Sequence, residues 1–204
     1  MTDTPAQPEL VTLPDPAMPE VKLIRPRRHG DNRGFFVETY SRKALAAYGI
    51  DEVFVQDNHS RSATAGTVRG LHFQAPPFAQ AKLVRCSAGR LLDVAVDIRR
   101  GSPTFGRHVA VELSADNGWQ LLVPVGFAHG FATLEPLTDI QYKVTADYSP
   151  AHDMGLLWND PELAIAWPVE AAQGVLSDKD KRQPRLADVA SPFDYVPPGG
   201  GRRA

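Results

Sequence analysis

The sequence predicts an all-β domain, an antiparallel sandwich or barrel with few helices. Three segments, residues 91–98, 109–113 and 139–145, alternate between two kinds of side chain with a period of two, as β-strands do. Turn signals rich in glycine, asparagine and aspartate separate the segments. Many short strands with turns between them favour a sandwich or barrel over a parallel sheet with helical crossovers.

The chain opens with a stretch that shows little periodicity. Residues 1–20 hold five prolines, which predicts a flexible N-terminal arm. A first strand is expected at 21–24. The one convincing helix spans 41–48, because Ser41 is a suitable N-cap and Gly49 a suitable stop.

The strands that follow have distinct patterns. In the segment 91–98 one face carries Leu92, Val94, Val96 and Ile98, and the other carries Asp93 and Asp97. Residues 109–113 alternate likewise, and the triplet 116–118, Asp-Asn-Gly, predicts a tight turn before a strand at 119–123. The last forty residues are rich in proline and irregular. The expected organisation is an arm at 1–20, one domain at 21–185 and an irregular tail at 186–204.

Composition excludes several classes of partner. With 22 basic and 24 acidic residues the net charge is −2, so no field attracts nucleic acid or an anionic membrane. A single cysteine, Cys86, rules out an internal disulfide framework and fits a reducing compartment. No leader pattern and no apolar run of membrane-spanning length is present. We therefore expect a cytoplasmic protein with neither nucleic-acid nor membrane partners.

Two histidine motifs are the most informative feature of the chain. Residues 70–74 read Gly-Leu-His-Phe-Gln, and residues 124–129 read Pro-Val-Gly-Phe-Ala-His. Both segments resemble strands of one domain, so His72 and His129 are candidates for one site. A metal-binding version of the first motif would need a third nitrogen where Gln74 stands. The pattern predicts acid–base chemistry inside a barrel, with no metal and no cofactor.

Eight motifs, in order between about Lys22 and Pro184, resemble those of the dTDP-4-dehydrorhamnose 3,5-epimerases. They occupy residues 31–38, 56–60, 69–74, 82–86, 93–99, 102–106, 126–131 and 158–161. The resemblance implies a metal-independent cupin, that is, a double-stranded β-helix jelly-roll barrel with a few short helices. It also implies a homodimer that converts dTDP-4-dehydro-6-deoxy-D-glucose, a nucleotide-linked 4-keto-6-deoxy sugar, into dTDP-4-dehydro-L-rhamnose by epimerisation at C3 and C5.

Such a reaction needs a base, an acid on the opposite face of the sugar and a group that stabilises an enolate. His72 is the candidate base, because imidazole titrates near neutral pH. A carboxylate behind it would fix its tautomer. The resemblance assigns that carboxylate to Asp180, while spacing alone leaves Asp178 open.

The candidates for the other two roles lie on predicted strands. Tyr142 is the candidate acid, because its alternation places it with Ile140 and Val144 on the face that points into a barrel. Lys82 is the candidate enolate stabiliser, since it would supply a fixed cation where negative charge develops.

A diphosphate is bound well by arginine forks and amide donors. The resemblance supplies Arg33, Gln56, Asn58 and Arg69 for this purpose, and it adds Glu38, Asp57, His129, Asp153 and Lys179 to the substrate-binding set. Strict alternation puts Arg69 and His72 on opposite faces of one strand. Either Gly70 makes a β-bulge, or one of the two side chains points elsewhere.

Three other functions remain open. Some relatives epimerise a single carbon, so a C3-only or C5-only epimerase of a related nucleotide sugar is an alternative. A metal-dependent cupin oxygenase or isomerase is more distant, because two imidazoles bind a divalent ion weakly. A sugar-nucleotide binder without activity would have no use for a base and an acid that face each other.

Overall fold

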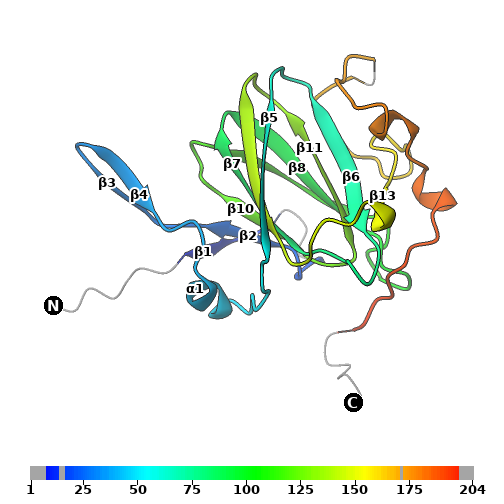
Figure 1. The fold of residues 1–204 in the computed structure, drawn as a ribbon, viewed down its shortest axis with the longest axis horizontal. Helices are drawn as coiled ribbons and strands as arrows, with labels where there is room; N and C mark the ends of the chain where they lie inside the picture. The colour runs from blue at the N-terminus through cyan, green and yellow to red at the C-terminus, as the bar shows by residue number, and fades with distance from the viewer. Residues whose placement is uncertain (1–7, 14–16, 171, 198–204) are drawn as a thin grey trace.

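The computed structural model describes residues 8–13, 17–170 and 172–197. Two antiparallel sheets face each other and form a barrel (Figure 1). The six-stranded sheet has the order β1 (Glu9–Val11), β2 (Lys22–Arg25), β10 (Gln120–Val123), β7 (Lys82–Ala88), β12 (Thr138–Val144) and β5 (Gln56–Ser62). The five-stranded sheet has the order β13 (Asp153–Gly155), β6 (Val68–Gln74), β11 (Phe127–Thr133), β8 (Arg90–Asp97) and β9 (His108–Ser114). The prediction of an all-β barrel is confirmed.

A two-stranded hairpin, β3 (Arg28–Asp31) and β4 (Gly34–Val37), projects away from the barrel (Figure 1). The helix α1 (Arg42–Ala46) follows it, and the Ser41 hydroxyl oxygen accepts a hydrogen bond from the Ala44 N–H, which confirms the predicted cap. The helix ends two residues earlier than expected. The N–H groups of Tyr48 and Gly49 bond to carbonyls three residues back, which tightens the last turn out of α-geometry.

The remaining helices are short 3₁₀ turns: η1 (Pro150–His152), η2 (Asp180–Arg182) and η3 (Leu186–Asp188). Among the described residues, none of the helices has the length and apolar character needed to cross a bilayer.

Strand β8 is buried on both faces. Leu91 and Ala95 point into the barrel, where they pack with residues of the facing sheet such as Val84 and Leu121. Val94 and Val96 point the other way and pack under the C-terminal segment, residues 156–193. Their neighbours there include Leu156, Leu163, Leu186 and Phe193. The face that carries Asp93 is therefore the inner face of the barrel, because the C-terminal segment covers the alternate face with apolar side chains.

The terminal segments are tied to the barrel where the structure describes them. Glu9–Val11, inside the expected arm, form β1 and pair with β2. Phe193, inside the expected tail, is buried against Phe73 with ring centroids 5.9 Å apart. Residues 1–7, 14–16 and 198–204 of the two expected segments lie outside the described residues. The boundaries at 20/21 and 185/186 stay predictions.

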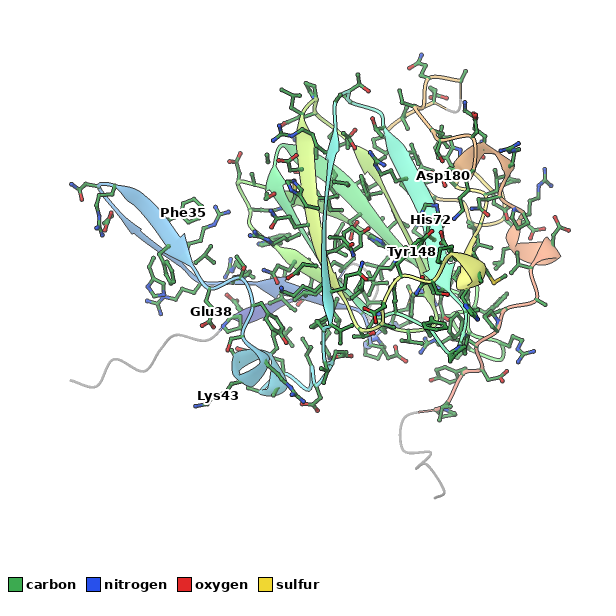
Figure 2. All side chains as sticks on the ribbon, viewed as in Figure 1. Phe35, Glu38, Lys43, His72, Tyr148 and Asp180 are labelled. Carbon is green, nitrogen blue, oxygen red and sulfur yellow. The ribbon has the colours of Figure 1, made fainter. Side chains whose placement is uncertain are left out.

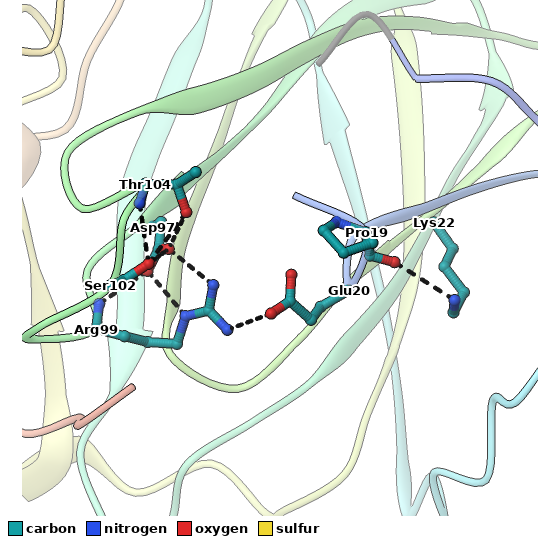
Figure 3. A network of polar contacts seen from close by, with 7 residues as sticks. All are labelled: Pro19, Glu20, Lys22, Asp97, Arg99, Ser102 and Thr104. Atoms are coloured by element: carbon teal, nitrogen blue, oxygen red, sulfur yellow. Dashed lines mark hydrogen bonds and ion pairs between the residues drawn. The ribbon is translucent and has the colours of Figure 1, made fainter. Parts of the chain in front are cut away.

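A buried polar network closes the end of β8 (Figure 3). The Asp97 carboxylate accepts hydrogen bonds from Arg99, Ser102 and Thr104, at 2.6–2.9 Å. Burial acts to raise the pKa of Asp97, but these hydrogen bonds outweigh it and hold the pKa below its usual value. Arg99 also contacts Glu20, at 2.9 Å, so the network joins the β8–β9 loop to the chain before β2.

Candidate active site

A cavity of about 470 Å³ lies between the two sheets. Its walls come from β5, β6, β7, β11, β12 and the C-terminal segment, and its lining includes Arg69, His72, Lys82, His129, Tyr142, Lys179 and Asp180. Of the sequence-predicted site residues, these seven are the ones that the structure brings together around one space.

The imidazole of His72 is bound to Asp180, with 2.5 Å between Nε2 and Oδ1 (Figure 2). Burial acts to raise the pKa of Asp180, but hydrogen bonds from His72 and Ser177 outweigh it and the pKa is lowered. An ionised Asp180 accepts a hydrogen bond from the Nε2–H of His72, and this tautomer leaves the Nδ1 lone pair available as a base. Asp178 is exposed and contacts Lys181, so geometry selects Asp180.

A β-bulge explains how Arg69 and His72, which strict alternation would place on opposite faces of β6, both line the cavity. Opposite β6, His129 pairs with His72 and Phe131 pairs with Arg69, so a step of three residues on β6 faces a step of two on β11. Gly70 sits inside this bulge with φ of +116°. A Cβ atom there would lie 2.6 Å from the Cα of Gly130. Glycine lets both side chains reach the cavity.

A second imidazole–carboxylate pair lies inside the barrel. His129 Nε2 is 2.8 Å from Asp93 Oδ1, and both residues are buried. Burial lowers the pKa of His129 and outweighs the opposing effect of Asp93. Among the described residues, no hydrogen-bond partner reaches Asp93 Oδ2. Sequence reasoning did not select Asp93 as functional, although an aspartate between the apolar Leu92 and Val94 was a usable signal.

Lys82 and Tyr142 come from the sheet that faces His72. Lys82 is 8% exposed, and its Nζ lies 3.4 Å from the His72 carbonyl oxygen. Burial lowers the pKa of Lys82 to about 8, although the negative charges of Asp153 and Asp93 act to raise it. Burial raises the pKa of Tyr142, although the positive charge of Arg69 acts to lower it. A hydrogen-bonded imidazole and a phenol thus line the cavity from β6 and β12, which belong to different sheets.

Three side chains meet beside the cavity. Asp153 Oδ2 accepts hydrogen bonds from the Tyr148 hydroxyl, at 3.0 Å, and from Lys179 Nζ, at 2.5 Å. Sequence reasoning did not identify Tyr148, because it lies in the loop after β12, where no periodicity reveals the direction of a side chain.

The predicted binding residues on β5 divide between two faces. The amide of Gln56 donates to Asn58, at 2.8 Å, and its carbonyl oxygen accepts from the Tyr148 N–H, at 3.2 Å. Asp57 points to the other face of the strand, where it forms an ion pair with Lys143 at 2.7 Å.

Arg33 and Glu38 lie outside the cavity of their own chain. Arg33 sits at the turn of the projecting hairpin and forms an ion pair with Asp31. Glu38 follows the hairpin and lines a separate hollow with Tyr40. Figure 2 shows Glu38 on the hairpin side of the molecule, away from His72 and Asp180.

Gln74 has a structural role. Its amide nitrogen donates to the carbonyl oxygens of Phe78 and Asp147, at 2.7 and 3.1 Å, and its oxygen accepts from the Ser149 N–H, at 2.7 Å. In the part of the chain that the structure describes, no three His, Cys, Asp or Glu side chains are grouped as a metal ion would require.

Comparison with known proteins identifies the family. The profile of the dTDP-4-dehydrorhamnose 3,5-epimerases matches residues 15–188. The enzyme of that name from Sinorhizobium fredii is 58% identical, over 87% of this chain and 90% of its own length. The crystal structure from Bacillus anthracis with TDP and PPi bound has a TM-score of 0.81 at 53% identity, covering 85% of this chain and 98% of that one.

The crystal structure of a third relative contains a nucleotide-linked keto sugar. The dTDP-6-deoxy-D-glucose-3,5-epimerase from Legionella pneumophila, in complex with dTDP-4-keto-L-rhamnose, has a TM-score of 0.87 at 41% identity. The match covers 94% of this chain and all of that one, which confirms the cupin-like jelly-roll fold. Profile, identity and fold agree, and this chain, a nucleotide-sugar isomerase, belongs to the dTDP-4-dehydrorhamnose 3,5-epimerase family.

Proposed function

We propose that the chain converts dTDP-4-dehydro-6-deoxy-D-glucose into dTDP-4-dehydro-L-rhamnose by inverting C3 and C5. One observation carries the proposal: the His72–Asp180 pair and Tyr142 line one cavity from facing sheets. Inversion next to a ketone requires a proton to leave from one face of the sugar and to return on the other. Two proton-transfer groups on opposite walls meet that requirement.

The geometry supports a role for one group in each proton transfer. Nδ1 of His72 takes the proton from the carbon next to the 4-keto group, and the ionised Asp180 stabilises the imidazolium that forms. The electron pair of the broken C–H bond moves to the ketone oxygen, where the ammonium of Lys82 stabilises the enolate. Tyr142 then protonates the carbon from the opposite face. Exchange with water returns a proton to Tyr142 and removes one from His72.

The charged end of the substrate needs cations outside the reacting centre. Arg69 and Lys179 line the same cavity as His72, and we assign them to the diphosphate. Gln56 contacts both Asn58 and the Tyr148 N–H, and we assign Gln56 and Asn58 to the nucleoside end, while Asp57 faces away from it.

A homodimer would bring the remaining predicted residues into use. Arg33 and Glu38 lie on or beside a projecting hairpin whose Phe35 and Phe36 are 60% and 71% exposed. Large exposed aromatic side chains on a protruding element are typical of a contact surface. We propose that the hairpin docks on a second copy and supplies Arg33 and Glu38 to the cavity of that copy. We also propose a cytoplasmic location, which the free thiol of Cys86 supports.

The test is hydrogen exchange in heavy water. Chelator-treated protein is incubated with dTDP-4-keto-6-deoxyglucose in D₂O, and deuterium at each sugar carbon is read by proton NMR and mass spectrometry. We expect label and inversion at both C3 and C5. Label at C3 alone or C5 alone would establish a mono-epimerase instead. Activity that is absent until a divalent metal is restored would refute the metal-free mechanism.

A further inference from the structure

The carboxylate of Asp153 joins three separate parts of the chain beside the active-site cavity. Asp153 belongs to β13, Tyr148 to the loop after β12, and Lys179 to the C-terminal segment. One oxygen, Oδ2, accepts from both partners, at 3.0 Å from the tyrosine hydroxyl and 2.5 Å from the lysine. The side chain of Asp153 is 15% exposed and that of Lys179 is 48% exposed. The ion pair is therefore accessible to a competing anion from solvent.

The position of this ion pair matters because Lys179 lines the cavity. Lys179 directly precedes Asp180, the partner of His72, and β13 pairs with β6 so that Gly155 lies opposite His72. A substrate whose sugar reaches His72 therefore occupies the same cavity as Lys179, the lysine that we assign to its diphosphate. Lys179 already has an anionic partner in Asp153, and two anions cannot both occupy its short-range contact without repelling each other.

We propose that Asp153 is an internal competitor of the substrate's diphosphate: it holds Lys179 and Tyr148 while the site is empty, and the diphosphate displaces it from Lys179. The ligand's identity as a nucleoside diphosphate rests on the proposed function. Exchange of one anion for another lowers the net affinity for the diphosphate, and the carboxylate can recapture Lys179 when product leaves. The hydroxyl of Tyr148 remains bound to Asp153 or turns to the ligand.

The sign of a binding change tests the proposal. In Asp153→Asn the competing charge is gone but the side chain keeps its size. Isothermal titration with dTDP should show binding that is tighter by about two- to fivefold, the scale of a partly exposed ion pair. Asp153→Ser should shift the affinity in the same direction, which guards against misfolding of a single variant. A residue that directly binds the nucleotide would give the opposite sign.

Asp178→Asn is the matched control. It removes the same charge one residue from Lys179, but Asp178 contacts Lys181, at 3.3 Å, and its side chain is 84% exposed. We expect its affinity for dTDP to stay within twofold of the wild-type value. An equal gain in Asp178→Asn would show that net charge, rather than the specific ion pair, sets the affinity.

A double-mutant cycle isolates the lysine. Lys179→Met should weaken dTDP binding. Adding Asp153→Asn to Lys179→Met should leave the dTDP affinity of that variant unchanged, because the competitor acts through Lys179. Weaker binding by Asp153→Asn, or the same tightening with and without Lys179, would overturn the proposal. Wild-type protein that fails to bind dTDP at all would instead refute the nucleotide part of the proposed function.

Discussion

His72 and His129 are direct cross-strand partners on β6 and β11, and the Nε2 atom of each imidazole contacts an aspartate. The two pairs differ in their surroundings. His129 and Asp93 are buried together, and burial lowers the pKa of His129, so this imidazole stays neutral near pH 7. His72 is 31% exposed at its side chain and lines the cavity. Burial therefore separates two chemically similar pairs: we propose the more exposed His72 as the base, while the buried His129 is a neutral polar group.

Replacing His72 with Asn should abolish turnover and spare ligand binding. The asparagine cannot accept a proton from carbon, while the groups assigned to the diphosphate are unchanged. Steady-state kinetics and dTDP titration measure the two properties separately. A variant that keeps its rate would exclude His72 as the base.

Asp180→Asn should lower kcat by about 10²- to 10⁴-fold, because the imidazolium loses its counter-charge.

Replacing Tyr142 with Phe should separate proton removal from inversion. His72 remains able to take and return a proton on one face, so deuterium from solvent should still enter the substrate. The opposite face lacks its acid, so the configuration should be retained. Proton NMR in D₂O distinguishes labelled substrate from labelled product. If Tyr142→Phe inverts at the wild-type rate, another group is the acid.

The charge of Lys82 predicts how activity depends on pH. Its pKa is lowered to about 8 in the folded protein, so the ammonium loses its proton as the pH rises through that value. We expect kcat to fall above about pH 8, because a neutral amine stabilises an enolate poorly. A rate that stays constant from pH 7 to 10 would contradict the assigned role.

The same shift predicts that Lys82→Met stabilises the fold while it removes activity. Below pH 8 the lysine is charged in both states, and its burial lowers the free energy of unfolding by up to roughly 3 kcal/mol. Above the ordinary pKa of 10.5 the amine is neutral in both states, and the difference vanishes. Urea unfolding of both proteins at pH 7 and pH 10 should show a gap that narrows with pH. A less stable Lys82→Met at pH 7 would contradict this prediction.

Gly70→Ala should unfold or strongly destabilise the barrel. The new Cβ would lie 2.6 Å from Gly130 Cα and 2.7 Å from the His129 carbonyl oxygen, and neither backbone atom can move without disrupting the β6–β11 ladder. Gly30→Ala is the control, because the nearest atom to its Cβ is 3.7 Å away. Thermal unfolding of the two variants provides the comparison. Equal melting temperatures would mean that the bulge tolerates a side chain.

The hairpin should control assembly. Phe36→Ser removes a large apolar side chain that is 71% exposed on β4, and we expect it to shift the protein toward monomer in light scattering. Phe105→Ser, on the β8–β9 loop and 42% exposed, should leave the oligomeric state unchanged. A wild-type protein that is already monomeric would refute the proposed homodimer.

Much of this architecture follows from local pattern. Alternation located β8, β9 and β12, and the Asp-Asn-Gly turn precedes β10 as expected. The cap at Ser41 was predictable because it depends only on residues three positions apart. Tyr142 was correctly expected on an inner face, since the side chains of a strand alternate about a fixed axis.

Residue type and short spacing were enough to predict strands such as β8, β9 and β12, the family and the candidate reactive groups. Which of these groups lie side by side depends on long-range packing. His72 and Asp180 lie 108 residues apart, and no local pattern distinguishes Asp180 from Asp178. The inward direction of Asp93 depends on the C-terminal segment that covers the other face of β8. The shared carboxylate of Asp153 likewise joins segments whose approach is set by sheet register and packing, and these are properties of the whole chain.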